Sequence, residues 1–199
     1  AYASMCMALS MFKRAIKYHK LGLALHTKLG YEWGRSKNLE LIGYYYEWIG
    51  DYRKGLEYFN MSYEIFTRLG DIKEQGMVLN GLEHCYYCMS DYNQSKIFLD
   101  RYSEIAKKTQ DEYFLTTEDM YYSRYYRDCG DIKKAYDCAH KANTLSLEKQ
   151  IWLNYCVSFI TLGSVAIEAG DIGDAIEYLE KGRELNTKYN FLKQYITPV

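Results

Sequence analysis

The chain has 199 residues, with 25 Lys or Arg against 26 Asp or Glu, which gives a formal net charge of −1. A nucleic-acid partner would need a concentrated basic face, so this balance argues against one. No run approaches the ~18 apolar residues of a membrane-spanning helix, so we expect no membrane segment.

A repeat with a period of 40 residues runs along the sequence. Its copies are Gly50-Asp51-Tyr52, Ser90-Asp91-Tyr92, Gly130-Asp131-Ile132 and Gly170-Asp171-Ile172, with Ser10-Met11-Phe12 as a degenerate first copy. Five residues into each copy is a small residue: Ala15, Gly55, Ser95, Ala135 or Ala175. A fixed period in this range indicates identical supersecondary units that cannot bury a core alone and must stack on one another.

In chain order, the repeat predicts a single array over residues 1–199. It consists of a partial hairpin (1–29), four hairpins (30–69, 70–109, 110–149 and 150–189) and the start of a further helix (190–199). The one proline is Pro198, so helix breakers of this kind do not interrupt the units. Neither end carries a capping unit with a polar outer face, and we therefore expect a fragment of a larger array.

The hairpin at 30–69 shows how each unit is built. Its apolar positions follow the i, i+3, i+4, i+7 spacing of one helix face: Leu39, Ile42, Gly43 and Tyr46. Gly50 then suits the left-handed position that ends a helix, and Asp51 suits the cap of the next helix. A mid-helix glycine costs ~1 kcal/mol against alanine, so the small residues at Gly43 and Gly55 predict that the two helices cross closely there.

These residues resemble the signature of the tetratricopeptide (TPR) family. The matching segments are Ile42-Gly43-x-x-Tyr46 with Gly55-x-x-x-Phe59-x-x-Ser62, and Leu162-Gly163-x-x-Ala166 with Ala175-x-x-x-Leu179-x-x-Gly182. The period is longer than the family's usual ~34 residues, and the proline that commonly ends the second helix is missing. Both departures resemble the longer-helix subclass of kinesin light chains and Rap-type regulators. The resemblance implies an all-α, right-handed superhelical solenoid of antiparallel helix hairpins.

The resemblance also implies that the first helix of each hairpin lines a concave groove. Carried over column by column, it predicts these partner-binding residues: Tyr44, Glu47, Trp48, Asn80, His84, Tyr87, Arg124, Arg127, Ile160 and Ser164. The set is aromatic at one end, basic in the middle and aliphatic at the other end. Such a groove suits a helix or an extended peptide with an apolar stripe and an acidic group.

Family members that bind chaperone tails place lysine and asparagine at two of these columns to clamp a C-terminal carboxylate. Here the two columns read Glu40/Tyr44, Asn80/His84, Met120/Arg124 and Ile160/Ser164. Because the clamp is absent, binding of Hsp70 or Hsp90 C-terminal tails is disfavoured.

The chain has 23 tyrosines, many of them clustered in the first helices. Tyr46, Tyr86 and Tyr126 share a signature column and are expected in the core. The others cannot all be core, because consecutive helical residues point about 100° apart. Two interpretations stay open for them: contacts between hairpins, or a binding surface, where tyrosine is enriched.

One segment, His84-Cys85-Tyr86-Tyr87-Cys88, has the residue types of a metal or redox site. The sequence has no second Cys-x-x-Cys, no His-x-x-x-His and no strand–helix context, so we expect helix-surface and packing residues, no metal and no cofactor. No phosphate-binding or metalloprotease motif occurs, and we expect no enzymatic activity. The six cysteines lie at unrelated repeat positions, which favours unpaired thiols in a reducing cytoplasm.

These observations predict a non-enzymatic scaffold that binds a protein or peptide, as the regulatory or sensory part of a larger cytoplasmic signalling protein. Two alternatives stay open. One is a small-ligand-sensing module of a transcriptional or signalling regulator, and the other is a structural spacer that mediates self-association.

Overall fold

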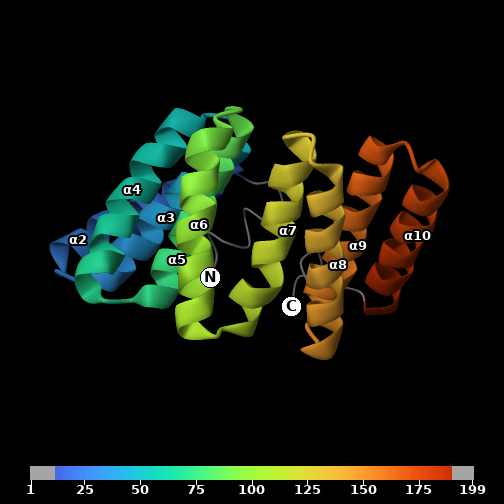
Figure 1. Cartoon of the computed structure of the whole chain (residues 1–199). Coiled ribbons are helices and arrows are strands. Elements are labelled where there is room, and N and C mark those ends of the chain that lie inside the picture. Colours follow the sequence, from blue (N-terminus) through green and yellow to red (C-terminus); the bar gives the residue numbers. More distant parts are fainter. Residues whose placement is uncertain (1–11, 190–199) are drawn as a thin grey trace. The chain divides into compact units, whose positions relative to one another are not determined.

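Helices joined by short turns make up nearly all of residues 12–189, which are the residues that the computed structural model describes (Figure 1). These residues contain nine helices and no strand. The parts of the expected array at residues 1–11 and 190–199 lie outside the described residues.

The described chain forms two compact units, 12–105 and 106–189, and each is described by itself. Unit 1 contains α2 (Phe12–Lys28), α3 (Glu32–Trp48), α4 (Tyr52–Leu69), α5 (Ile72–Cys88) and most of α6 (Tyr92–Thr109). Unit 2 contains α7 (Glu112–Asp128), α8 (Ile132–Glu148), α9 (Trp152–Ala169) and α10 (Ile172–Tyr189). From α2 to α5 and from α7 to α10, each helix packs on the next, and the first helices of neighbouring hairpins also touch, α3 on α5 and α7 on α9. This is the contact pattern of stacked helix hairpins.

The turns between these helices share one backbone feature, a residue with positive φ that recurs every 20 residues. The positions are Gly30, Gly50, Gly70, Ser90, Gln110, Gly130, Gln150 and Gly170. Gly50 (φ 81°) is followed by Asp51, whose side chain accepts a hydrogen bond from the Lys54 amide and caps α4. The roles predicted for Gly50 and Asp51 are therefore confirmed. Ser90 adopts the same left-handed region (φ 59°), although glycine adopts it at lower cost.

Phe59 of α4 is the centre of the closest helix packing in unit 1. Its ring is fully buried and lies against Gly43 of α3 and Gly81 of α5. A Cβ atom at Gly43 would lie 2.8 Å from the Phe59 ring, and a Cβ atom at Gly81 would lie closer still. At Gly55 a Cβ atom would lie 3.1 Å from Cys85 Sγ. The close crossing predicted from the small residues is thus present, and glycine is required where the ring enters.

The tyrosines of the signature column differ from expectation, because they are half-buried and do not lie in the core. Tyr46 stacks on Tyr58 with ring centroids 5.4 Å apart, and Tyr86 stacks on Phe98 at 5.3 Å, in both cases at an interplanar angle of 9°. Tyr126 likewise remains half-buried. Tyr46 and Tyr86 therefore stack on the second helix of their own hairpin, on Tyr58 and Phe98.

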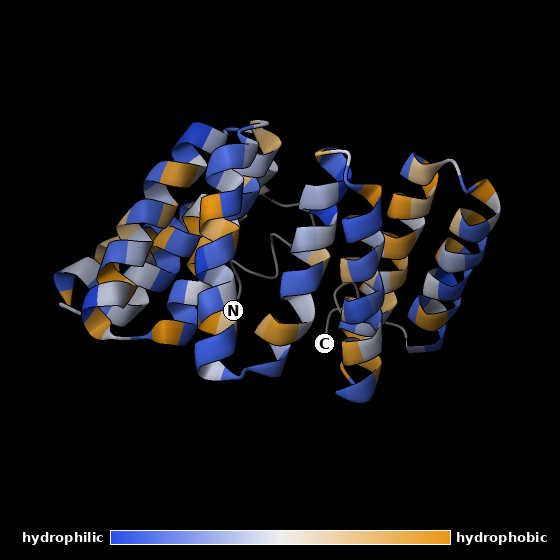
Figure 2. Ribbon diagram, in the orientation of Figure 1, coloured by the Kyte–Doolittle hydropathy of each residue, from blue (hydrophilic) through white to orange (hydrophobic). Residues whose placement is uncertain are grey.

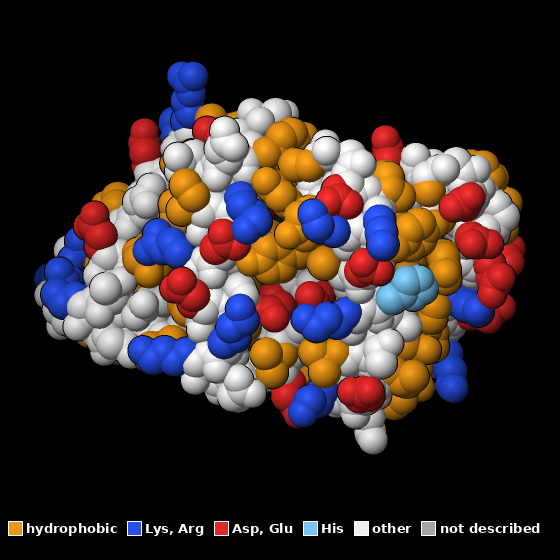
Figure 3. Space-filling model, viewed as in Figure 1, with side chains coloured by type: hydrophobic (Ala, Val, Ile, Leu, Met, Phe, Trp, Pro, Cys, Tyr) orange, Lys and Arg blue, Asp and Glu red, His pale blue; other side chains and the backbone are white. Residues whose placement is uncertain are grey.

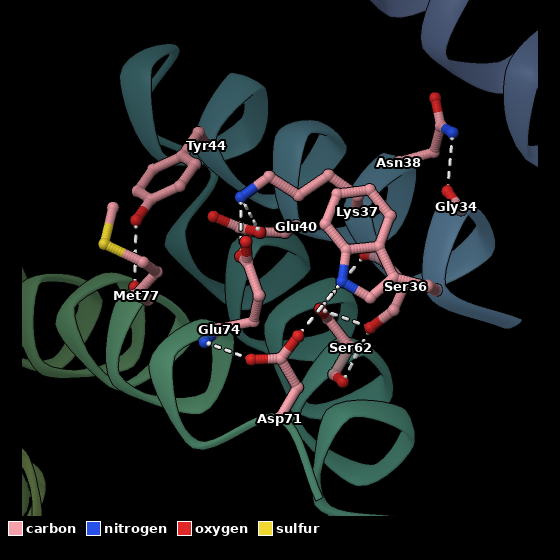
Figure 4. A network of polar contacts seen from close by, with 11 residues as sticks. Gly34, Ser36, Lys37, Asn38, Glu40, Tyr44, Ser62, Asp71, Glu74 and Met77 are labelled. Atoms are coloured by element: carbon pink, nitrogen blue, oxygen red, sulfur yellow. Dashed lines mark hydrogen bonds and ion pairs between the residues drawn. The ribbon is translucent and has the colours of Figure 1, made fainter. Parts of the chain in front are cut away.

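Polar contacts connect α3 to its neighbours inside unit 1 (Figure 4). Ser36 and Ser62 are both fully buried, and each hydroxyl donates to the other residue's carbonyl oxygen, at 2.9 and 3.1 Å. Beside them, Lys37 Nζ lies 2.8 Å from the Glu40 carboxylate and 2.7 Å from Glu74 of α5. A buried carboxylate needs such a partner, so this lysine helps to fix α5 against α3.

In unit 2, α9 is long and apolar enough, by length and composition, to cross a membrane, with a mean hydropathy of 1.2 over 18 residues (Figure 2). The sequence analysis expected no such segment. One helix of this kind is weak evidence for a span, because core helices of soluble proteins pass the same test. Here α9 packs against α7, α8 and α10, with Leu162, Val165 and Ala166 buried. Its other side is exposed and belongs to the candidate site.

Candidate functional site

Unit 1 brings together three of the predicted partner-binding residues at the end of two first helices. Glu47 of α3 is 8% exposed, and its Oε1 lies 2.7 Å from Nδ1 of His84 in α5. The ring of Tyr87 stacks on the His84 ring, with centroids 6.1 Å apart and an interplanar angle of 19°. Residues 47 and 84 are nearly one repeat apart, which is why equivalent ends of α3 and α5 place them side by side.

The other predicted residues of unit 1 have different surroundings. The Tyr44 hydroxyl donates to the Met77 carbonyl oxygen at 3.0 Å, and its ring meets Phe59 edge to face. Tyr44 is therefore chiefly a packing residue between α3 and α5. Trp48 is 58% exposed, and Asn80 is half-buried on α5. Of this group, Trp48 offers the largest accessible apolar surface.

A cysteine adjoins the Glu47–His84 pair. Cys88, one helical turn after His84, is partly exposed, and its Sγ lies 3.7 Å from His84 Nε2 and 3.9 Å from Nδ1. The Tyr52 hydroxyl is hydrogen-bonded to Cys88, and this bond is the main cause that raises the pKa of Tyr52. Cys85, by contrast, is fully buried, and burial raises the pKa of its thiol far above the usual value.

Unit 2 brings the remaining four predicted residues to one hollow of about 420 Å³ between α7 and α9. Arg124 and Arg127 line it from α7, and Ile160 and Ser164 line it from α9. The other lining residues are Tyr113, Thr117, Met120, Tyr121, Leu153, Asn154, Val157 and Thr161. The first helices of two neighbouring hairpins thus form the hollow, at the columns that the sequence pattern indicated.

The walls of this hollow combine cationic groups with aliphatic side chains. The Arg124 guanidinium lies 5.6 Å from the centroid of the Tyr121 ring, an arrangement that holds a planar cation over an aromatic face. Arg127 Nε donates to the Asp128 carboxylate at 2.6 Å. Opposite them, Ile160 is 51% exposed, which is unusual for an isoleucine on a helix that packs against three others.

Sequence reasoning did not include Tyr121, Leu153 and Asn154 among the predicted site residues. A signal was present for Leu153, because it lies seven residues before Ile160 and so faces the same side of α9. Asn154 is buried, and its amide donates to Thr116 Oγ1 at 2.7 Å, a contact between α9 and α7 that no local pattern encodes.

Metal chemistry finds no support in the part of the chain that the structure describes. No group of three or more His, Cys, Asp or Glu side chains within residues 12–189 could hold a metal ion. The Cys85–Cys88 pair does not form half of such a site, since Cys85 is buried in the core and Cys88 lies beside His84.

Several solved structures are similar to this chain over nearly all of its length. A Rap protein complexed with Competence and Sporulation Factor superposes with a TM-score of 0.82 at 15% identity, covering 98% of this chain and 54% of that protein. The apo form of RapI superposes with a TM-score of 0.74 at 17% sequence identity, covering 95% of this chain and 71% of RapI. A putative kinesin light chain from Podosopora anserina with nearly identical TPR-like repeats superposes with a TM-score of 0.68 at 15% sequence identity. The match covers 94% of this chain and 93% of that protein.

These likenesses establish the fold. The chain is an all-α array of TPR-like helix hairpins, as the 40-residue repeat predicted. It spans about half the length of the Rap protein complexed with Competence and Sporulation Factor. In sequence, no protein-family model matches the chain, and no curated protein matches it either.

Proposed function

We propose that this chain is a non-enzymatic scaffold that binds a protein or peptide segment along its first helices. The observation that carries the proposal is the hollow between α7 and α9 in unit 2, where exposed aliphatic side chains face two guanidinium groups. Aromatic and arginine side chains dominate protein-binding hot spots, and exposed aliphatic side chains around them add apolar contact area. The exposed Trp48 and the Tyr87–His84 stack give unit 1 the same character on its first helices.

The chemistry of the hollow favours a segment that carries an apolar side chain beside an acidic group. Leu153, Val157 and Ile160 would receive the apolar side chain, since each is more than a third exposed. Arg124 and Arg127 would receive the carboxylate, for which a guanidinium is geometrically suited. That one protein of similar fold has been crystallised with a bound factor supports this kind of role.

The proposed partner is neither a nucleic acid nor a chaperone tail. On the face drawn in Figure 3, basic and acidic side chains are mixed and form no extended basic field, which supports the first exclusion. In the columns of the carboxylate clamp, Glu40 is 1% exposed and the Tyr44 hydroxyl is bonded to Met77, which supports the second.

The proposed setting is a larger cytoplasmic protein of which this array is the regulatory or sensory part. The described cysteines support a reducing compartment, since Cys85, Cys129, Cys138 and Cys156 are thiols outside any disulfide. A membrane location is not proposed, because α9 is held among the helices of unit 2.

A small-ligand sensor is the second candidate. The hollow has a volume of about 420 Å³, within the range of small-molecule sites, and it combines apolar walls with a few polar groups. An anionic metabolite would use the same arginines as an acidic peptide.

Selection from a random peptide library on the immobilised chain, followed by fluorescence polarisation of the selected peptides, tests the proposal. Ile160→Asp should weaken binding by at least tenfold, about 1.4 kcal/mol, because it puts a charge on the apolar wall. Ile176→Asp on α10 is the matched control, since Ile176 is 53% exposed against 51% for Ile160.

Equal loss of binding in the two variants would contradict the groove assignment. If no peptide is selected and a library of anionic metabolites raises the melting temperature, the small-ligand function replaces the peptide function.

A further inference from the structure

We propose that Cys88 is a reactive thiol that exchanges with small-molecule disulfides, with His84 as its proton acceptor and Glu47 as the group that positions the imidazole. The proposal concerns unit 1 alone and does not depend on what the groove binds. It stands on the arrangement of four side chains from three helices: Glu47 of α3, Tyr52 of α4, and His84 and Cys88 of α5.

The contact between Glu47 and His84 decides which ring nitrogen carries the proton. A carboxylate oxygen can only accept, and Oε1 of Glu47 lies 2.7 Å from Nδ1, so Nδ1 donates. In the neutral ring Nε2 is then the basic nitrogen. Cys88 Sγ lies 3.7 Å from Nε2 and 3.9 Å from Nδ1, so it sits beside the ring and not on the axis of the Nε2 lone pair. A rotation of the Cys88 or His84 side chain therefore precedes proton transfer, and nucleophile–base pairs are often loose in this way before the reactant binds.

Glu47 offers the His84 ring a buried anionic partner. Its carboxylate is 8% exposed, and the second oxygen, Oε2, has no hydrogen-bond partner among the described residues. A buried anion that is incompletely paired gains more than a solvated one when its neighbour becomes cationic. Proton transfer from Cys88 to His84 would therefore convert the Glu47–His84 hydrogen bond into an ion pair.

Tyr52 supplies a hydroxyl donor beside the sulfur. The bond between its hydroxyl and Cys88 would stabilise a thiolate, since an O–H donor interacts more strongly with an anion. Two features oppose the thiolate: the negative charge of Glu47, and the position of Cys88 as the last residue of α5, where the helix dipole disfavours an anion. The proposal therefore requires both His84 and Tyr52.

The repeat itself does not demand these residues. Forty residues before and after, the His84 column holds Tyr44 and Arg124, and the Cys88 column holds Trp48 and Asp128. Packing of the hairpins is thus compatible with quite different side chains at both positions. The combination is a feature of one hairpin and not of the array.

The exchange balances without any further reactant. The S–H bond of Cys88 breaks, its proton passes to Nε2 of His84, and the sulfur attacks one sulfur of the disulfide. The disulfide bond breaks as the new mixed disulfide forms, and the leaving thiolate takes the proton from His84. One thiol and one disulfide are consumed, and one of each is produced.

The test uses the full chain and 5,5′-dithiobis(2-nitrobenzoic acid) at neutral pH, with mass spectrometry to assign each mixed disulfide. Cys129 is the internal control, because it is exposed while Cys88 is only partly exposed. Cys88 should react about tenfold faster than Cys129, since rates follow thiolate content more than exposure. His84→Gln should lower the rate at Cys88 about tenfold and leave Cys129 unchanged.

Tyr52→Phe and Glu47→Gln are independent variants in case His84→Gln fails to fold. Each should lower the reaction rate of Cys88 and leave that of Cys129 unchanged. A Cys88 that reacts no faster than Cys129 would overturn the proposal. So would an unchanged Cys88 rate in folded His84→Gln, with folding judged by the thermal melt.

Discussion

The Lys37 ammonium lies 2.8 Å from the carboxylate of Glu40, one helical turn along α3, and this pair is enclosed between α3 and α5. Burial raises the pKa of Glu40 from 4.5 to about 7, and the positive charge of Lys37 opposes this rise. The folded chain therefore holds a proton on Glu40 at pH values where the unfolded chain has released it.

The first prediction concerns the pH dependence of stability. Because the folded-state pKa of Glu40 is the higher one, its contribution is fully present below about pH 4.5 and is lost as the pH rises through about 7. Glu40→Gln should remove this loss. Its free energy of unfolding relative to the parent chain should rise by on the order of 3 kcal/mol between about pH 4.5 and about pH 8.

Urea denaturation at several pH values measures this difference, in which the titrations of other groups cancel. Glu74→Gln is the matched control, because Glu74 binds the same lysine but its side chain is 20% exposed. If the difference in free energy of unfolding between Glu40→Gln and the parent chain stays constant with pH, the pKa of Glu40 is not raised in the folded chain.

The second prediction concerns the close packing around Phe59. Gly81→Ala should destabilise the chain by about 1–3 kcal/mol, because the added methyl group overlaps a ring that is fully buried and cannot move aside. Gly173→Ala, in α10, should be neutral or stabilise by up to about 1 kcal/mol, since nothing lies within 4 Å of its Cβ position. Thermal melts of both variants decide the question, and a stable Gly81→Ala would show that α4 and α5 are further apart.

The third prediction concerns the buried hydroxyl pair of Ser36 and Ser62, whose oxygens lie 3.0 Å apart. Ser36→Ala should cost about 1 kcal/mol, because the Ser62 carbonyl oxygen loses the hydroxyl that donates to it in a dry environment. The double alanine variant should cost about the sum of the two single variants, since each hydroxyl donates to a separate carbonyl oxygen. A double-mutant cycle measures the coupling, and a coupling well outside error would mean that one hydroxyl donates to the other.

The fourth prediction separates the first helices from the second helices as the binding surface. Arg124→Ala should weaken a partner bound in the hollow of unit 2 by about tenfold or more, and Tyr87→Ala should do the same to a partner bound at the His84–Tyr87 stack of unit 1. Lys133→Glu and Lys134→Glu on α8 should have little effect, because exposed charges away from an interface contribute weakly. Fluorescence polarisation and circular dichroism together test this. Loss of binding only in the lysine variants would place the partner on the second helices.

The sequence determined the array and the position of its turns. The left-handed residues at Gly50, Gly130 and Gly170 and the cap at Asp51 depend on local backbone chemistry, which a short segment specifies by itself. The small-residue columns also identified where helices approach closely, because glycine inside a helix is costly unless a neighbour needs the space.

Only the tertiary structure decided which side chains meet across helices. The sequence placed Tyr44, Glu47 and His84 on one surface, yet Tyr44 is held in packing and Glu47 is buried against His84. The sequence likewise indicated no metal or redox chemistry for Cys88, and the structure places its sulfur beside His84 and Tyr52. The physical reason is that periodicity fixes the face of a helix on which a residue lies. The crossing of neighbouring helices and the rotamers at that crossing then fix its partners.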